Sequence, residues 1–404
     1  MRRAESLLLI GSLYLAQGLP YGFFTGALPV MLREQGLSLK AISATSLLFL
    51  PWALKFLWAP LVDRVGTRRG WLLSLQAASV LLAVALAAFN PADGLLPLLG
   101  ALFLFNLIAA TQDIATDGLA VRLLDPRERG LGNGLQVGGY RVGMILGGGA
   151  LLAFYATAGW GAMCLAMAAL LALASVPAWR LREAPAVHPP HAPGLALQWL
   201  ARLRQPGMGS LIALIVVYKF GDSMVATLVG PFMKDAGLAT AQIAWIKGTL
   251  GSGVTLAGAA AGGWIAFRLG RRAALLGCGL LQAASLLLYV ASALAPGIGL
   301  ITAASVAEHL FGGMATVALF TLMMDASDPE HAGADYTLLA CALVLAQGLA
   351  QFSGAVLADA FGYLPMFSGG FVVALAGCLL LVRALDRGAG PRRLAQVWPR
   401  PAAG

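Results

Sequence analysis

The chain has 404 residues, of which 59% are hydrophobic and only 11% are charged, and its formal net charge is +9. Soluble domains carry about 25% charged residues, so this composition excludes an ordinary soluble domain and indicates a membrane protein. The positive charge does not indicate a nucleic-acid partner, because the basic residues are concentrated on one side of the predicted membrane.

Apolar segments long enough to cross a membrane recur along the whole chain. A helix needs about 20 apolar residues to cross a hydrocarbon core about 30 Å thick. This criterion predicts twelve transmembrane helices, over residues 6–32, 41–62, 71–90, 95–121, 132–155, 159–179, 209–233, 241–266, 273–294, 298–324, 336–358 and 363–384. Lipid offers no partner for unpaired backbone groups, which excludes open strands, and the segments are too long for a barrel. The predicted fold class is all-α and polytopic.

The basic residues indicate the orientation of these helices. If the N-terminus is cytoplasmic, twenty of the 27 Lys and Arg residues fall on cytoplasmic connections and tails, whereas only Arg33, Lys40 and Lys234 fall on the other side. Such an excess on cytoplasmic loops is the usual pattern in membrane proteins. We therefore expect a multi-pass protein of the bacterial inner (cytoplasmic) membrane, with both termini in the cytoplasm.

The most polar connection follows the sixth predicted span and divides the chain into similar halves. PVMLREQGLSLKAI (29–42) is echoed by PFMKDAGLATAQI (231–243), and DPRERG (125–130) by DPEHAG (328–333). Repeats in the same order at a nearly constant offset predict a duplicated unit, hence two pseudo-symmetric six-helix bundles. The predicted organisation is an N-terminal bundle over 1–180, a cytoplasmic linker over 181–208, a C-terminal bundle over 209–386 and a cytoplasmic tail over 387–404.

The connection after the second predicted span reads APLVDRVGTRR (59–69). It resembles the signature of the major facilitator superfamily at Ala59, Leu61, Asp63, Arg64, Gly66, Arg68 and Arg69. A degenerate second copy, GWIAFRLGRR (263–272), has Phe267 in place of the acid. The resemblance implies two six-helix bundles around a central cavity, which rock to expose the cavity to either side of the membrane.

Three further stretches resemble one group within that superfamily. They are YLAQGLPYGF (14–23), LPWALKFLWAPLVDR (50–64) and TQDIATDG (111–118). The group holds muropeptide permeases, acetyl-CoA transporters and ferri-siderophore permeases of the pyochelin and rhizobactin type. Muropeptide permeases typically carry extra C-terminal spans, and this chain has room for only twelve, which favours the siderophore branch.

The resemblance therefore implies a secondary transporter that imports a siderophore or ferri-siderophore by alternating access. Buried acids, described below, favour coupling to protons. The alternative solute is a muropeptide or another anionic sugar-peptide or metabolite, and export of similar solutes is also open, because one cavity serves either direction.

The signature also predicts a cytoplasmic gate. We expect Asp63 to face the positive end of a neighbouring helix, and Arg68 to pair with an acid on the fourth span. Together with Arg64, these groups would hold the cytoplasmic ends of the bundles together and release them when the bundles rock. The alternative is a solvated turn with no such role.

Charged residues inside the predicted spans need partners or water, because burying a charge at the bilayer centre costs from about 2.5 to more than 10 kcal/mol. They are Lys55, Asp113, Asp117, Arg141, Lys219, Asp222, Lys247 and Glu308. A rise of about 1.5 Å per residue gives Lys55, Asp113 and Arg141 similar depths on three spans. We therefore expect Asp113 to pair with Arg141 or Lys55. Asp117 lies nearer the cytoplasm and is predicted to join the gate.

These charges have structural and functional interpretations. Desolvation favours a neutral carboxyl unless a cation keeps it ionised. Asp113 is therefore either a proton carrier or half of a structural pair, and Arg141 and Lys55 are candidate contacts for an anionic ligand. In the second half, Lys219 and Asp222 share a helix face and either satisfy each other or bind ligand and proton. Glu308 beside His309 suits proton handling, because imidazole titrates near neutral pH, although a structural role is the alternative.

Polar and aromatic side chains at helical spacing predict the walls of the cavity. Tyr14, Gln17 and Tyr21 recur every three or four residues on the first span. Aromatics with amides suit a large, partly apolar ligand, although packing alone would also explain them. The predicted substrate contacts are Tyr14, Gln17, Tyr21, Lys55, Gln112, Gln136, Tyr140, Arg141, Lys219, Tyr336 and Gln347. The glycines of 130–150 predict a packing and hinge helix instead.

No nucleophile triad, nucleotide fingerprint or metal-ligand spacing occurs in the sequence, and the four cysteines fall in four different spans. We therefore expect no enzyme activity, no cofactor and no metal site. The expected partners are a small-molecule substrate, protons and membrane lipid, with no nucleic acid, and the expected state is a monomer.

Overall fold

The computed structural model of the chain describes residues 3–28, 31–32, 48, 50–89, 95–181 and 201–398. Within these ranges all regular structure is helical, without a strand. Among the described residues, ten helical segments are long and apolar enough to cross a membrane. The predicted all-α polytopic fold class is confirmed. The predicted linker and tail lie partly outside the described residues.

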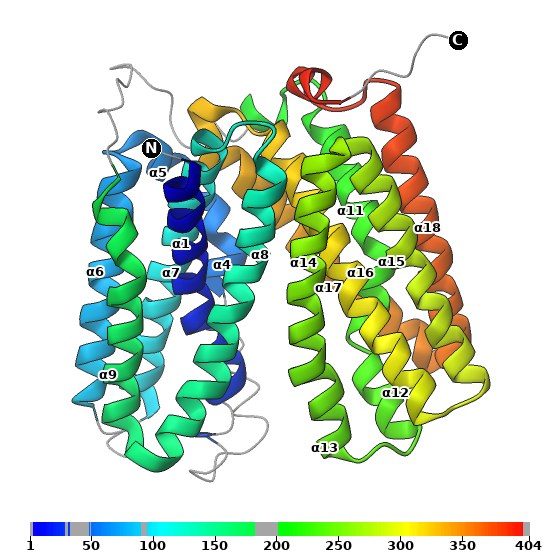
Figure 1. The fold of residues 1–404 in the computed structure, drawn as a ribbon, viewed down its shortest axis with the longest axis horizontal. Coiled ribbons are helices and arrows are strands. Elements are labelled where there is room, and N and C mark those ends of the chain that lie inside the picture. Colours follow the sequence, from blue (N-terminus) through cyan, green and yellow to red (C-terminus); the bar gives the residue numbers. More distant parts are fainter. Residues whose placement is uncertain are drawn as a thin grey trace. The chain divides into compact units, whose positions relative to one another are not determined.

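The chain forms two compact units, drawn in Figure 1. Unit 1 comprises Met1–Leu124, Leu135–Trp199 and Asp328–Cys341, and unit 2 comprises Asp125–Gly134, Leu200–Ser327 and Ala342–Gly404. Each unit is built mainly from one half of the sequence and includes a short piece of the other half. The first turns of α8 thus belong to unit 2 and those of α17 to unit 1. The boundaries at 180 and 209 stay a prediction.

The first half of the chain supplies most of unit 1. Its elements are α1 (Arg3–Gly22), the π-helical turn η1 (Phe23–Ala27), α4 (Leu50–Leu54), the 3-10 turn η3 (Lys55–Leu57), α5 (Ala59–Arg64), α6 (Arg68–Ala87), α7 (Leu95–Leu123), α8 (Arg129–Ile145), the π-helical turn η5 (Leu146–Ala150) and α9 (Leu151–Trp179). An apolar core including Phe23, Phe105 and Met167 lies between these helices.

The second half supplies most of unit 2. Its elements are α11 (Met208–Ala226), α12 (Val229–Asp235), α13 (Thr240–Ile243), the π-helical turn η6 (Ala244–Leu250), α14 (Gly251–Arg268), α15 (Gly270–Leu294), α16 (Ile298–Ala326), the 3-10 turn η7 (Pro329–His331), α17 (Ala332–Phe361), α18 (Tyr363–Asp386) and the 3-10 turn η8 (Arg392–Gln396). Its core includes Tyr289, Met366 and Phe367.

Three predicted spans differ in form from single straight helices. The helical run Arg129–Trp179 covers both 132–155 and 159–179, and the chain reverses at Gly159, where φ is 80° and only glycine fits without strain. The described part of 41–62 is broken into α4, η3 and α5. Pro60 opens α5 and has no N–H to continue the hydrogen bonding of the preceding turn, which explains the break at Trp58.

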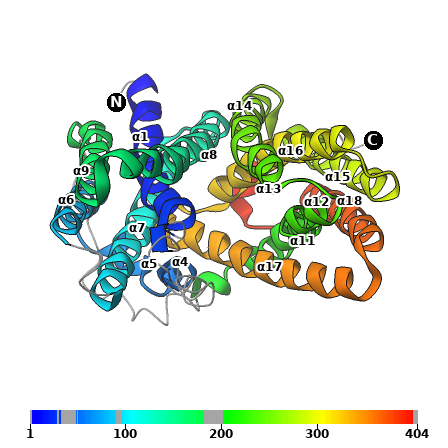
Figure 2. The ribbon, with the colours of Figure 1, turned by 90° about the horizontal axis from the view of Figure 1, so that it is seen from below.

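Helices pack in the same order within the two units. In unit 1, α9 packs against α1 and α6, and α7 packs against α5 and α6. In unit 2, α18 packs against α11 and α15, and α16 packs against α14 and α15. Figure 2 shows these neighbours in end-on view. The sixth and fourth spans of the first half thus have the same neighbours as the twelfth and tenth, which supports the predicted duplication.

Glycines bring α8 and η5 very close to α1 inside unit 1. A Cβ atom on Gly143 or Gly147 would collide with the carbonyl oxygens of Leu15 and Leu19, and one on Gly18 would collide with the carbonyl of Tyr140. Small residues allow this approach in membrane helices, where dispersion forces reward close contact. The predicted packing role of this helix is confirmed, and the hinge role stays a prediction.

Candidate functional site

A buried ion pair lies in the polar centre of unit 1. Lys55 Nζ contacts Asp113 Oδ2, and both side chains are largely buried. Lys55 is carried by η3, where the break in the second span points it at the middle of α7. The ammonium also lies 5.6 Å from the centroid of the Trp52 ring. Of the two partners expected for Asp113, the structure therefore selects Lys55 and leaves out Arg141.

Asp117 belongs to the same centre, and its predicted role in the cytoplasmic gate stays a prediction. Tyr14 donates a hydrogen bond to Asp117 Oδ1 at 2.6 Å, and Gln136 Nε2 lies 3.5 Å from the same oxygen. Residues four apart share one face of a helix, so Asp117 faces the same way as Asp113. The position of Asp117 along the helix axis does not by itself specify the direction in which its side chain points.

Further predicted cavity residues complete this polar centre. Gln17 donates to Thr116 at 2.8 Å, and its buried Oε1 has no hydrogen-bond partner among the described residues. Gln136 and the hydroxyl of Tyr336 lie 3.3 Å apart, which connects α8 to the start of α17. Gln112 is buried on α7. Five of the eleven predicted substrate contacts are thus gathered around the two acids: Tyr14, Gln17, Lys55, Gln136 and Tyr336.

Arg141 lies one residue beyond Tyr140 on α8 and is half-buried. It forms no hydrogen bond or ion pair with the part of the chain that the structure describes. Those two rings are 5.5 Å apart, and Tyr21 also packs edge-on against Trp52 at 6.1 Å. A guanidinium beside an aromatic wall, without a carboxylate, is available to an anionic ligand.

The signature connection of the first half forms a second cluster in unit 1. Asp63 pairs with Arg68 and accepts hydrogen bonds from the backbone N–H groups of Gly333, at 3.2 Å, and Ala334, at 2.7 Å. These N–H groups open α17, so Asp63 faces the positive end of a helix, as expected. The expected pairing of Arg68 with an acid on the fourth span stays a prediction.

The turn between α5 and α6 explains why Arg68 pairs with Asp63. Gly66, with φ at 70°, reverses the chain and brings Arg68 back onto Asp63. At the end of α7, Arg122 donates instead to the carbonyl oxygens of Pro329 and Glu330 in the start of the same α17 segment. Arg64 lies half-buried in the last turn of α5. The gating role of these residues stays a prediction.

The predicted residues of unit 2 form separate local pairs. Lys219 Nζ lies 2.8 Å from Asp222 Oδ2 on the same helix and 3.4 Å from the hydroxyl of Thr316. Asp222 Oδ1 is buried without a hydrogen-bond partner among the described residues. Glu308 and His309 are 2.9 Å apart on α16, and His309 Nδ1 lies 2.8 Å from the carbonyl oxygen of Ser305.

Gln347 does not join these groups. It lies half-buried on α17 and forms no hydrogen bond with any residue in the described ranges. The predicted residues of the second half therefore make no cluster comparable with that of unit 1, and their proposed roles in proton coupling and ligand binding stay predictions.

One buried acid in unit 2 was missed by the sequence analysis. Asp325, at the end of α16, has a fully buried side chain that pairs with Arg129 at 2.8 Å and with Arg271 at 2.6 Å. The residue is three positions before the DPEHAG segment, whose counterpart DPRERG contains Arg129. The repeated segments therefore contained the signal, but only the structure shows that the two regions meet.

Comparison with known proteins agrees with this architecture. A family model described as the Major Facilitator Superfamily matches residues 10–342. The anhydromuropeptide permease of Escherichia coli (strain K12) is 31% identical over 395 residues, which cover 94% of this chain and 79% of the relative. A putative transporter of Rickettsia felis (strain ATCC VR-1525 / URRWXCal2), AmpG 4, is 24% identical over 387 residues, which cover 91% of this chain and 94% of the relative.

Solved structures agree in fold. The transporter FucP in its outward conformation has a TM-score of 0.72 at 15% identity, with 93% of this chain and 97% of that chain covered. The human organic anion transporter MFSD10 has a TM-score of 0.73 at 15% identity, with 94% and 100% covered. At such identities the likeness concerns the fold alone.

These comparisons do not support siderophore import specifically and agree better with the muropeptide alternative. The sequence analysis ranked that alternative second because the chain is short. A chain of twelve predicted spans can nevertheless be 31% identical to a muropeptide permease that extends beyond it. Chain length therefore does not decide the solute in this group.

Proposed function

The chain belongs to the Major Facilitator Superfamily and is a multi-pass secondary transporter rather than an enzyme, and we propose that it imports an anionic sugar-peptide of the muropeptide class. The observation that carries this proposal is Arg141, a half-buried cation that has no ionic partner in the described chain and follows Tyr140 on α8, where Tyr140 packs against Tyr21. The similarity to an anhydromuropeptide permease supports it.

The chemistry of such a solute matches this part of unit 1. A guanidinium binds a carboxylate with two parallel hydrogen bonds, a geometry that an ammonium does not offer. Sugar rings have apolar faces that pack on aromatic side chains, which Tyr21, Tyr140 and Trp52 supply. Gln17 leaves a buried carbonyl oxygen without a hydrogen-bond partner in the described residues, which would accept a hydroxyl or amide donor of the solute.

Proton coupling is assigned to the two acids of α7. Lys55 neutralises Asp113, which leaves Asp117 with the neutral donors Tyr14 and Gln136 but without a cation of its own. Two carboxylates that share one ammonium in a desolvated site do not both stay ionised without cost. We therefore place the exchangeable proton on this pair, and import then follows the proton gradient across the inner membrane.

The Asp63 cluster provides the gate for this cycle. Its contacts join the signature connection to the start of α17, two regions about 270 residues apart in sequence. Access from the cytoplasm requires these contacts to break, after which water solvates both charges. An Asp63→Asn variant should insert into the membrane normally and transport slowly, and full transport by it would contradict the gating role. All these groups lie in one chain, so we propose a functional monomer.

Uptake in whole cells tests the proposed solute. The test uses bacterial cells that lack their own muropeptide permease and express this chain, whose termini we expect in the cytoplasm. These cells should accumulate a radiolabelled anhydromuropeptide, and a protonophore should abolish the accumulation. An iron-loaded siderophore and a neutral disaccharide serve as comparison solutes. Uptake of the iron chelate without the muropeptide would overturn the solute class. Efflux of preloaded muropeptide against its own concentration gradient would overturn the direction.

A further inference from the structure

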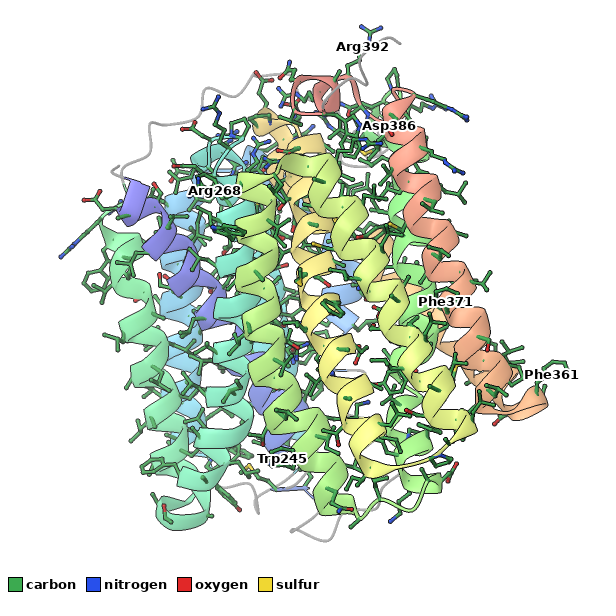
Figure 3. All side chains as sticks on the ribbon, turned by 45° about the vertical axis from the view of Figure 1, so that its right-hand side comes forward. Trp245, Arg268, Phe361, Phe371, Asp386 and Arg392 are labelled. Atoms are coloured by element: carbon green, nitrogen blue, oxygen red, sulfur yellow. The ribbon has the colours of Figure 1, made fainter. Side chains whose placement is uncertain are left out.

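We propose that a pocket at the end of α18 binds the phosphodiester headgroup of an anionic phospholipid between the guanidiniums of Arg387 and Arg392. The pocket has a volume of about 500 Å³ and is lined by residues of the segment 385–398. It lies wholly within unit 2, so the inference depends neither on the transported solute nor on the polar centre of unit 1. Figure 3 shows Asp386 and Arg392 at this end of α18 and Phe361 near its other end.

The chain that follows α18 folds back and forms a wall of this pocket. Gly388 and Gly390 have φ angles of 81° and 98°, in the left-handed region where a side chain would be strained, and Pro391 then precedes the turn η8. The turn η8 packs against α16, and Leu394 and Trp398 are buried. The wall of the pocket is therefore a packed segment of unit 2, and glycine and proline at fixed positions specify its course.

Asp386 is the acid among the lining residues, and its charge is already paired. Arg272 Nε lies 2.9 Å from Asp386 Oδ1 and Nη2 lies 3.0 Å from Oδ2, and the indole N–H of Trp398 donates to Oδ1 at 3.0 Å. Arg387 and Arg392 are exposed, and their side chains form no hydrogen bond or ion pair with the described chain. Two guanidiniums of the pocket are thus available to an anion from outside the chain.

The exposed face of α18 leads from the hydrocarbon core to the pocket. Val372 and Leu380 are exposed on this face. Arg383 and Arg387, both exposed, follow Leu380 by three and seven residues, which keeps them on the same side of the helix. A rise of about 1.5 Å per residue places Arg387 about 10 Å beyond Leu380, which corresponds to the step from acyl chains to headgroups. A lipid whose chains lie against this face would therefore present its phosphate to the pocket.

An anionic phospholipid fits the pocket better than a small anion or a neutral lipid. Guanidiniums bind phosphate oxygens with paired hydrogen bonds, which Arg387 and Arg392 can supply. Leu385, Leu394 and Ala395 add apolar wall that would cover the glycerol and the first methylenes, which a free phosphate lacks. A zwitterionic headgroup carries an ammonium that the two arginines would repel. This end of α18 is also predicted to face the cytoplasm, where anionic headgroups attract basic segments.

Retention of lipid by the protein tests this site. The full chain is placed in nanodiscs of equal parts phosphatidylglycerol and phosphatidylcholine, and the lipid that stays bound after release is counted by native mass spectrometry. Phosphatidylglycerol should be retained in preference to phosphatidylcholine by about tenfold or more, and Arg387→Gln with Arg392→Gln should remove the preference. Arg127→Gln with Arg268→Gln is the matched control, because both arginines are exposed in unit 2 and lie outside the pocket. The control removes the same charge and should keep the preference.

A second variant separates the pocket from the positive charge around it. Ala395→Trp places a large side chain in the pocket and keeps every charge, so it should lower the retention of phosphatidylglycerol as strongly as loss of the two arginines. Gln396→Trp changes an exposed neighbour that does not line the pocket and should retain the lipid. Because Ala395 is itself exposed, its replacement keeps the test decisive even if the arginine variant does not fold.

The outcomes that would overturn the proposal are distinct. Equal retention of the two lipids, an equal loss of preference in the arginine control, or undiminished retention in Ala395→Trp would each contradict a headgroup pocket. Displacement of the lipid by an equal concentration of glycerol 1-phosphate would identify a site for a free anion and contradict the lipid. The assay contains no transported solute, so failure of muropeptide uptake would leave this inference unaffected.

Discussion

The two units each bury a lysine–aspartate pair at the level of the membrane, but the pairs differ in what they connect. Lys55 and Asp113 belong to different helices, η3 and α7, and a second acid, Asp117, lies one turn away. Lys219 and Asp222 belong to one helix, three residues apart. An interhelical pair senses any movement of its helices, whereas a pair within one turn travels with its helix unchanged. This difference supports our proposal that energy coupling lies in unit 1.

The largest effect on transport is expected at Asp113. Asp113→Asn leaves the Lys55 ammonium buried without a carboxylate, and removing one partner of a buried pair costs about 3–5 kcal/mol. We expect concentrative uptake to fall at least about 100-fold, while exchange of solute across proteoliposomes persists. Counterflow measured in parallel with uptake distinguishes a loss of concentrative uptake from a loss of solute exchange. Accumulation at the wild-type level would show that Asp113 is only structural.

Arg141 is a cation that belongs to neither lysine–aspartate pair, and its replacement tests ligand binding separately from them. Arg141→Gln should raise the apparent KM for the solute about tenfold, because a charge-assisted hydrogen bond contributes about 1.5–3 kcal/mol. The thermal midpoint should stay unchanged, because no described residue loses an ionic partner. Arg141→Lys should recover part of the affinity through its charge. A fall in kcat at constant KM would argue against a ligand contact.

Tyr14 tests whether Asp117 takes part in the cycle. Tyr14→Phe removes the donor at 2.6 Å from Asp117 and leaves the ring in place. We expect the initial rate of proton-driven uptake to fall several-fold, with solute binding in equilibrium dialysis unaffected. The Gln17→Leu variant, which removes a neighbouring polar group on α1, should weaken binding instead. If Tyr14→Phe and Gln17→Leu lowered the uptake rate and solute binding equally, a separate role of Tyr14 in proton coupling would be contradicted.

The smallest effect is expected in unit 2. Lys219→Gln combined with Asp222→Asn removes both charges of the local pair and preserves its volume, and replacing a buried pair as a whole is often neutral. Uptake should therefore stay within about twofold of the wild type. The same double replacement at Lys55 and Asp113 should abolish accumulation. A strong loss in the Lys219/Asp222 variant would move part of the coupling to unit 2.

Much of this site followed from local sequence. Tyr14 and Gln17 were identified by their spacing on one apolar helix, and Lys55 and Asp113 by the cost of a charge in a span. The hydrogen bond from Tyr14 to Asp117 did not follow from depth along the helix axis, because depth does not specify the direction in which a side chain points. Asp325 was missed because its partners, Arg129 and Arg271, are 196 and 54 residues away, and no pattern within a helix announces them.

The sequence by itself determined the membrane class, the helical fold, the orientation expected from Lys and Arg and the membership suggested by APLVDRVGTRR. These properties depend on the length of apolar segments and on charges counted along the chain, which are local quantities. Only the tertiary structure shows that Lys55 and not Arg141 contacts Asp113, that Arg141 has no ionic partner in the described chain, and that Asp325 pairs with Arg129 and Arg271. Those outcomes depend on which helix faces meet, and a pairing energy exists only when two side chains lie within a few ångströms of each other.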